Sequence, residues 1–294
     1  MSAYFAPAFF SHLLGKCLRR KNPLLEVSKL GLTVLITFAI VWWPYIHSMD
    51  EFLGVLSRLA PFERGIYEDY VANFWCTTSV FIKWKRLFTT QSLKFLSLAA
   101  TLFTCLPSMV QQIWAPSSEG FLYALLNSSF AFYLFSFQVH EKSILLPLLP
   151  ASLLALKMPH PFSWLTHYAL FSMFPLLCRD KLVLPYFSIC AQFFLFLHAS
   201  FGLRGRCNKK DTLFPGSTVP TPFSILFRII YFFSLILHVI YLKVQPPKKY
   251  PFLFEAVIML LCFSYFVLFT LYANLKQWML SRQSTSGDTE KKTL

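Results

Sequence analysis

The chain has 294 residues, of which 56% are hydrophobic, 18% are aromatic and only 14% are charged. Soluble domains carry about 25% charged residues, so this composition and a mean hydropathy of +0.53 exclude an ordinary soluble protein and indicate a membrane protein with several spans. The 27 basic residues outnumber the 13 acidic ones and give a net charge of +14. Because they are spread over short segments between apolar runs, they favour membrane topology over nucleic-acid binding.

The apolar residues fall into successive runs that predict an all-α, polytopic fold with about nine transmembrane spans. A straight span needs about 20 residues, and the fifth and sixth runs, which contain Pro147, Pro150 and Pro175, are shorter. We expect them to be irregular helices, either spans with snorkelling neighbours or the halves of a broken or re-entrant pair. The runs cover roughly residues 4–18, 30–46, 93–113, 120–139, 144–156, 165–178, 182–203, 222–244 and 253–275.

Basic residues in the connecting segments predict the orientation. Clusters of Lys and Arg lie at 19–29, at 204–210 and at 276–292. Placing all three clusters in the cytosol threads nine spans without conflict. The segment at about 48–92 and the turn at 140–143 then both fall on the lumenal side.

Four basic residues contradict this rule, because they would lie on the lumenal side: Lys83, Lys85, Arg86 and Lys94. A ligand phosphate or a helix lying in the membrane interface would explain them. We therefore predict a transmembrane region over residues 1–280 with a lumenal loop at about 48–92. The polar segment 281–294 is expected to be a disordered cytosolic tail.

The long lumenal loop contains the first candidate site, in the sequence RLAPFERGIYEDYVANFWC. Glu68 and Asp69 are adjacent carboxylates, and Arg64 precedes them. Carboxylates deprotonate or hydrogen-bond sugar hydroxyls, and an arginine clamps a phosphate. The alternative is a surface loop held by local Arg–carboxylate pairs and an aromatic belt.

The segment FQVHEKSILLP contains the second candidate site. It places His140, Glu141 and Lys142 directly between two apolar runs, where ionisable side chains are costly. We predict that His140 and Lys142 bind an anionic headgroup and that Glu141 orients one of them. The alternative is a charged helix end whose cations snorkel to the surface.

No motif indicates a metal or a cofactor. None of the seven cysteines forms a CxxC pair, so neither a zinc site nor a disulfide framework is expected. His167, His198 and His238 are isolated in apolar runs and are expected to be packing residues. The sequon at Asn127 lies inside an apolar run, where the modifying enzyme does not reach it.

The two candidate segments together resemble the endoplasmic-reticulum glucosyltransferases of asparagine-linked glycosylation. PFERGIYEDYVANFWC and FQVHEKSILLPLLP are similar to the member that adds the first glucose, and the likeness runs from near Ala3 to about Asn274. The chain resembles only the C-terminal part of such a GT-C-type glycosyltransferase. The resemblance implies that the general base lies in an N-terminal lumenal loop outside this chain. Tyr70 stands where the family leads us to expect a lysine.

The resemblance implies that glucose passes from dolichyl-phosphate glucose to the dolichyl-diphosphate oligosaccharide Man9GlcNAc2 through an α-1,3 bond, with inversion. It also implies a multi-pass location in the endoplasmic reticulum membrane, contact with the lipid bilayer, and no cofactor, metal or nucleic-acid partner. The donor phosphate would be bound by His140, Lys142 and Arg64, with support from Glu141. Glu68 and Asp69 are the only substitutes for the base in this chain.

Two other hypotheses stay open from the sequence. One is a catalytically inactive, truncated membrane fragment that binds the lipid donor or a partner chain. The other, which ignores the resemblance, is a transporter of a lipid or an anion, although no inverted repeat of spans is found.

Overall fold

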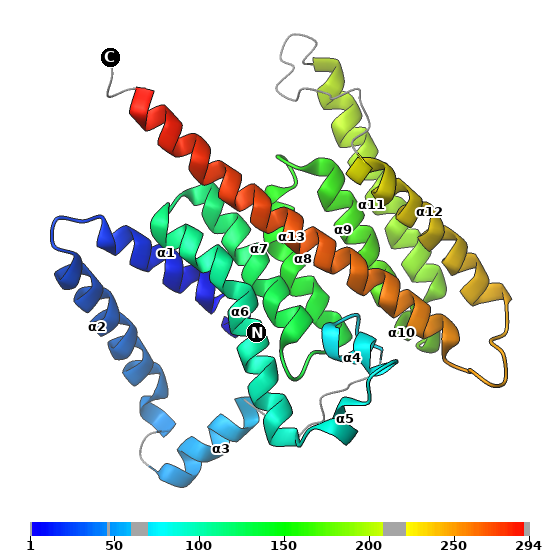
Figure 1. The fold of residues 1–294 in the computed structure, drawn as a ribbon, viewed down its shortest axis with the longest axis horizontal. Helices are drawn as coiled ribbons and strands as arrows, with labels where there is room; N and C mark the ends of the chain where they lie inside the picture. Colours follow the sequence, from blue (N-terminus) through cyan, green and yellow to red (C-terminus); the bar gives the residue numbers. More distant parts are fainter. Residues whose placement is uncertain (1, 46–47, 60–69, 208–221, 291–294) are drawn as a thin grey trace. The chain divides into compact units, whose positions relative to one another are not determined.

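A computed structural model describes residues 2–45, 48–59, 70–207 and 222–290 (Figure 1). Within these ranges the chain is helical and contains no strand. It divides into two compact units, one formed by residues 1–68, 88–139 and 272–294 and the other by residues 69–87 and 140–271. We call them unit 1 and unit 2.

The helices of unit 1 come from three parts of the chain. They are α1 (Ala6–Leu18), α2 (Pro23–Trp42), α3 (Met49–Leu59), α6 (Thr90–Trp114), α7 (Ser118–Phe135) and the second part of α13 (Leu253–Glu290). The helices of unit 2 are α4 (Phe74–Ser79), α5 (Trp84–Leu87), the 3₁₀ turn η3 (Glu141–Ile144), α8 (Leu145–Leu154), α9 (Pro159–Ser172), α10 (Phe174–Arg179), α11 (Val183–Cys207), α12 (Pro222–Lys243) and the first part of α13.

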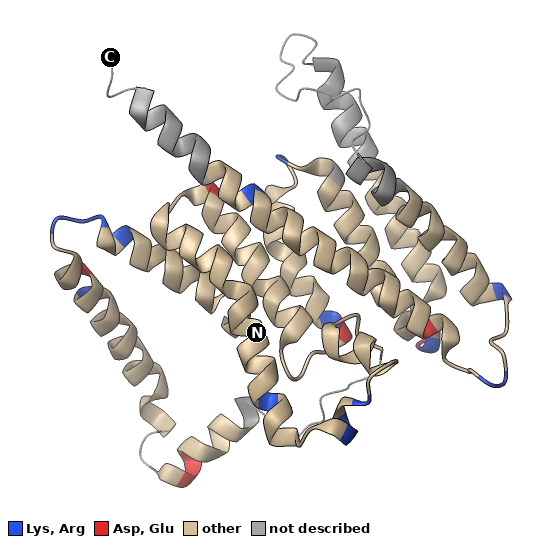
Figure 2. Ribbon diagram, viewed as in Figure 1, with Lys and Arg blue, Asp and Glu red and all other residues tan. Residues whose placement is uncertain are grey.

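Each of the nine apolar runs lies on helix, which confirms the all-α fold of a polytopic membrane protein. Among the described helices, three are long and apolar enough to cross a bilayer by length and composition: Pro23–Tyr45, Thr90–Trp114 and Leu253–Leu280. Shorter apolar helices cover Val183–Phe196 and Ile229–Lys243. Figure 2 shows that Lys, Arg, Asp and Glu lie mostly at helix ends and in connections, as expected where helix middles face hydrocarbon.

The fifth and sixth runs form the irregular helices that their prolines predict. Helix α8 spans 10 residues, follows η3 directly and contains Pro150. Helix α9 ends at Ser172, and α10 begins two residues later with a proline in its first turn. A proline lacks the N–H that a helix interior needs, but it fits the first turn, so Pro175 marks a new helix start.

Helix α13 extends into the segment that is predicted to be a disordered tail, and the disorder itself stays a prediction. Helix α13 continues to Glu290, and so it includes most of the segment that begins at residue 281. No proline interrupts this polar stretch, and a helix already formed extends with one backbone hydrogen bond for each added residue.

Helices α1, α6 and α7 pack together in unit 1, and the approach of α1 to α6 is close. A Cβ atom placed on Gly15 would lie 2.7 Å from the carbonyl oxygen of Gln112 and 2.9 Å from that of Ile113. The His12 ring hydrogen-bonds the Gln112 amide, and the Arg19 guanidinium donates to the carbonyl of Trp114. A small residue is what lets two membrane helices approach this closely.

A buried amide network joins α6, α7 and α13 in unit 1. The Gln277 side chain, which is fully buried, accepts hydrogen bonds from Ser108 Oγ at 2.7 Å and Asn127 Nδ2 at 2.9 Å. Its Nε2 donates to Gln111 Oε1 at 2.7 Å and to the Ser108 carbonyl at 3.1 Å. Asn127 is therefore a buried packing residue, in agreement with the expectation that its sequon is not modified.

Helices α2 and α7 differ sharply in burial. None of the residues of α2 is buried in the chain, whereas most of α7 is, from Gly120 through Leu134. Helix α2 contacts α1, and its apolar side chains are otherwise exposed. In a bilayer such a surface faces lipid or another protein segment.

Helices α9, α12 and α13 of unit 2 are joined by aromatic and histidine contacts. The rings of Tyr168 and Tyr265 stack with centroids 4.0 Å apart. His167 hydrogen-bonds Ser234 Oγ at 2.7 Å, and His238 hydrogen-bonds the Tyr186 hydroxyl at 2.8 Å. Both histidines are buried and satisfied, as predicted. They are not isolated, because their rings lie 5.9 Å apart, and His198 lies where side chains are not described.

Candidate functional site

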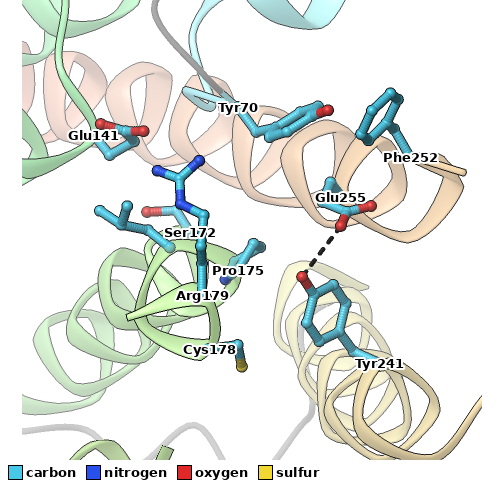
Figure 3. A pocket seen from close by; sticks show the side chains of 10 residues that line it. Tyr70, Glu141, Ser172, Pro175, Cys178, Arg179, Tyr241, Phe252 and Glu255 are labelled. Atoms are coloured by element: carbon cyan, nitrogen blue, oxygen red, sulfur yellow. Dashed lines mark hydrogen bonds between the residues drawn. The ribbon is translucent and has the colours of Figure 1, made fainter. Parts of the chain in front are cut away.

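A pocket with a volume of about 420 Å³ lies in unit 2 where several helix ends meet (Figure 3). Charged and aromatic side chains share its lining with Ser172, Pro175, Leu176 and Cys178. The charged residues are Glu141, Arg179 and Glu255. The aromatic residues are Tyr70, Tyr241 and Phe252. The pocket therefore combines both charge signs with aromatic walls.

Glu141 reaches the pocket from the 3₁₀ turn that starts the HEKS segment. His140 precedes η3 as its N-cap in extended conformation, and its carbonyl accepts a hydrogen bond from the Ser143 N–H at 2.9 Å. Ile144 closes the turn and is fully buried. This anchors the turn so that Glu141 points into the pocket, while the neighbouring side chains of His140 and Lys142 are exposed.

Arg179 reaches the pocket from the last turn of α10, whose end is tightly defined. The Leu182 N–H donates to the Leu177 carbonyl at 2.8 Å, and the Lys181 N–H donates to the Cys178 carbonyl at 3.1 Å. This is the Schellman pattern, which needs a left-handed residue after the helix. Lys181 supplies it with a φ of 60°. A cation in the last turn also suits the negative end of the helix dipole.

Glu255 lies in the first turn of α13 and is held by Tyr241 of α12. The Tyr241 hydroxyl donates to Glu255 Oε1 at 3.1 Å, the bond drawn in Figure 3. The second carboxylate oxygen, Oε2, is buried and has no hydrogen-bond partner among the described residues. A buried oxygen of this kind is expected to accept a hydrogen bond from a ligand or a water. Glu255 is thus more than the helix-start charge that its position in the sequence indicates.

Aromatic rings form another wall of the pocket. The rings of Tyr70 and Phe252 lie with centroids 5.8 Å apart. Tyr70 replaces the lysine that the family resemblance leads us to expect, so an aromatic ring stands where a cation was expected. Among the described lining residues, Arg179 is the pocket's cation.

The segment that follows Tyr70, VANFWC, has a structural role. Asn73 is buried, and its Oδ1 caps α4 by accepting the Cys76 N–H at 2.8 Å. Trp75 is only 1% exposed and packs against Trp84, whose indole N–H donates to Thr78 Oγ1 at 2.8 Å. These contacts hold the connection between Tyr70 and Leu87 together, and the Phe74 ring lies 6.4 Å from the ring of Phe263 on α13, centroid to centroid.

The structure brings together part of the predicted site and adds residues that sequence reasoning missed. Glu141 lines the pocket, and His140 and Lys142 flank it in the same turn without lining it. Arg64, Glu68 and Asp69 lie outside the described residues. Arg179 was missed, although Arg179, Asp180 and Lys181 form a charged triplet at the end of an apolar run, the same signal that singled out the HEKS segment.

The pocket residues lie on the same side of the membrane in the predicted topology. In the predicted topology, Tyr70 and Glu141 belong to lumenal segments, and Arg179, Tyr241 and Glu255 lie at the lumenal ends of their runs. The pocket gathers these residues from five places in the sequence. Carboxylates that accept from hydroxyls, a guanidinium that binds phosphate, and aromatic faces are the groups that recognise a sugar phosphate.

Comparisons with known proteins identify the family of this chain. A model of the ALG6, ALG8 glycosyltransferase family matches residues 1–272. The probable dolichyl pyrophosphate Man9GlcNAc2 alpha-1,3-glucosyltransferase of Arabidopsis thaliana is 65% identical over the whole chain, which covers 55% of that protein. The glucosyltransferase of that name from Gallus gallus is 35% identical over 93% of the chain, and the one from Saccharomyces cerevisiae is 36% identical over 92%.

The chain covers 57% of the Gallus gallus protein and 55% of the Saccharomyces cerevisiae protein. It thus spans a little more than half the length of these relatives. The family model matches almost all of this chain, including the HEKS segment and the helices that form the pocket. With this match and these identities, the chain belongs to the ALG6, ALG8 glycosyltransferase family.

Proposed function

We propose that the chain takes part in transferring glucose from dolichyl-phosphate glucose to Man9GlcNAc2 on dolichyl diphosphate, through an α-1,3 bond, at the endoplasmic reticulum membrane. The observation that carries this proposal is the identity with relatives named for the Man9GlcNAc2 acceptor. The pocket supports it, because its lining combines the groups that bind sugars and phosphates.

The reaction requires one bond to form and one to break at the anomeric carbon of glucose. A mannose hydroxyl oxygen attacks this carbon, and the bond to the phosphate oxygen breaks on the opposite face, which inverts the configuration. The electron pair leaves with dolichyl phosphate, and the hydroxyl proton passes to a base. Cations near the phosphate stabilise the charge that develops on it.

The proposed phosphate site consists of the exposed side chains of His140 and Lys142 on the HEKS turn, with Arg64 as a further member. The geometry of the pocket adds Arg179, whose guanidinium shares the lining with Glu141. Glu255 Oε2 and the Tyr70 and Phe252 rings are suited to hold a sugar ring. The base stays unassigned, with Glu68 and Asp69 as candidates in this chain.

A chimera tests the proposed function. Residues 1–294 replace the aligned segment of the Arabidopsis thaliana relative, and the chimera is expressed in yeast cells that lack their own enzyme for this step. We expect glucosylated Man9GlcNAc2 to reappear in the lipid-linked oligosaccharide profile. A chimera that reaches the membrane at the level of the intact relative and yields no glucosylated product, while that relative does, would contradict the proposal.

Variants of the chimera test the site. A hydrogen bond to a charged group contributes about 1.5–3 kcal/mol, so Arg179→Ala and Lys142→Ala should each lower transfer roughly ten- to a hundred-fold. Arg179→Lys should keep part of the activity, because charge survives but the forked geometry does not. Lys157→Ala, at the other end of α8, is the matched control and should leave transfer unchanged. Normal transfer by well-inserted alanine variants would remove these residues from the site.

The inactive-fragment hypothesis gains no support from the comparisons, since the relatives are named as glucosyltransferases. It makes a distinct forecast for the chimera. A chain that only binds the donor would retain photoreactive polyprenyl-phosphate glucose in a crosslinking assay but would give no glucosylated oligosaccharide.

A further inference from the structure

Unit 1 contains a groove with a volume of about 860 Å³ where the start of α6 meets the end of α7. Polar residues line one part of it: Gln91, Ser92, Lys94 and Ser136. Apolar side chains, among them Phe95, Leu98 and Phe132, line most of the rest, together with the hydroxyl residues Ser97 and Thr101. None of these residues lines the pocket of unit 2, so the groove needs an account of its own.

The polar part is built around the first turns of α6. The Lys94 ammonium lies 5.7 Å from the centroid of the Phe137 ring, a contact that holds it at the groove. The Thr89 side chain accepts the Ser92 N–H and caps the helix, and the first turn contains no acidic residue. The helix dipole therefore adds to the lysine charge at this place instead of being neutralised.

The sequence that leads into α6 is one-sided in charge. Between residues 70 and 118 there is no Asp or Glu, while Lys83, Lys85, Arg86 and Lys94 are all basic. This is the cluster that contradicts the positive-inside rule in the predicted topology. A bound anion would account for basic residues on that side of the membrane.

The apolar part of the groove is exposed. Phe95 is 74% exposed and Leu98 is 57% exposed, and both belong to α6, one of the described helices that is long and apolar enough to cross a membrane. The first turns of this helix carry a cation and hydroxyls, and exposed apolar side chains follow them. This order suits the binding of an amphiphile that has an anionic head and apolar chains.

We infer that this groove binds a phospholipid of the surrounding bilayer, with its phosphate at Lys94 and its acyl chains along Phe95 and Leu98. The groove has one lysine and no carboxylate among its lining residues. This set matches a single phosphate and lacks the carboxylates that accept most strongly from the hydroxyls of a glycosylated lipid. The site is additional to glucose transfer and does not depend on it.

Photo-crosslinking tests this inference. The chain is reconstituted in phosphatidylcholine vesicles with a trace of diazirine-bearing phosphatidylglycerol or phosphatidylcholine, and labelled peptides are mapped by mass spectrometry. We expect the anionic probe to label residues 90–101 severalfold more than the choline probe. Lys94→Gln should lower this preference about fivefold, the ratio expected for one lysine facing an anionic headgroup, whereas Lys94→Arg should retain it.

Lys276→Gln is the matched control, because Lys276 also lies over an aromatic ring, 5.8 Å from the centroid of Tyr272. It should leave the labelling of residues 90–101 unchanged. Equal labelling by both probes would overturn the inference, and so would unchanged labelling in a well-folded Lys94→Gln variant. Displacement by unlabelled polyprenyl phosphate but not by unlabelled phosphatidylglycerol would also overturn it, by assigning the groove to a different lipid.

Discussion

The contact between α1 and α6 makes Gly15 a sensitive position, and Gly15→Ala tests it. The added Cβ would lie 2.7 Å and 2.9 Å from two backbone carbonyl oxygens of α6. Backbone atoms in a helix do not rotate away, so the helices must separate. Overpacking of this kind costs typically 1–3 kcal/mol. Alanine regains about 1 kcal/mol of helix propensity over glycine, which leaves a net loss of up to about 2 kcal/mol.

Gly31→Ala is the control that isolates the steric part. Gly31 lies within α2 and has no atom within 4 Å of the added Cβ, so only the gain in helix propensity applies. The two variants should therefore differ by about 1–3 kcal/mol in the free energy of unfolding. Both substitutions remove a glycine from a helix, so effects on the unfolded chain largely cancel.

The reactivity of Cys105 measures this difference. Cys105 lies on α6 and is 1% exposed, so a thiol reagent modifies it only when unit 1 opens. In a background where Cys105 is the only cysteine, the detergent-solubilised chain is titrated with denaturant, and modification is followed. Gly15→Ala should react at lower denaturant concentration than Gly31→Ala. Equal curves for the two variants would refute the close approach of α1 to α6.

Three further predictions follow from single contacts. Gln277→Leu leaves Asn127 Nδ2 and Ser108 Oγ without their acceptor. Interhelical hydrogen bonds in membranes average about 0.6 kcal/mol and reach about 1.7 kcal/mol each, so the Cys105 thiol assay should show a loss of roughly 1–3 kcal/mol in the free energy of unfolding. An unchanged curve would contradict the network. Lys181→Gly removes the strain of a non-glycine residue in the left-handed conformation. It should stabilise the chain by up to about 1 kcal/mol and so raise its thermal unfolding temperature. A lower temperature would argue against the Schellman end of α10. Asn73→Ala removes the cap of α4 and should cost about 0.5–2 kcal/mol, whereas Asn73→Asp keeps the acceptor and should lose less; equal losses measured by thermal unfolding would exclude capping as the cause.

Much of the fold could be predicted from the sequence because hydrocarbon enforces helices. Backbone groups in a bilayer need internal hydrogen bonds, so each apolar run had to be helical, and Pro175 marked the start of α10. Burial could not be predicted in the same way. The runs that form α2 and α7 are both apolar, yet one is exposed and the other mostly buried, because burial depends on which helices pack together.

The candidate site, too, could be predicted from the sequence only in part. Glu141 was identified because three charges between two apolar runs form a local signal. Arg179, Tyr241 and Glu255 converge only through the packing of α10, α12 and α13, and Glu255 taken alone is a common charge in a first helical turn. The VANFWC segment carried much of the family resemblance, yet Asn73 and Trp75 serve the fold. A specific motif therefore identified the family better than it identified the site.

The contrast between α2 and α7 has a consequence for how the sequence tolerates change. The side chains of α2 are exposed, so within this chain they are constrained in composition more than in shape, and many apolar exchanges should be tolerated there. In α7 the constraint is positional: a Cβ on Gly120 would displace Ser117 Oγ and Gln112 Oε1, and Asn127 must reach Gln277. Random substitution should therefore leave α2 functional after many apolar exchanges, whereas α7 should reject most of them. Sequence drift should therefore be governed by hydrophobicity in α2 and by packing neighbours in α7.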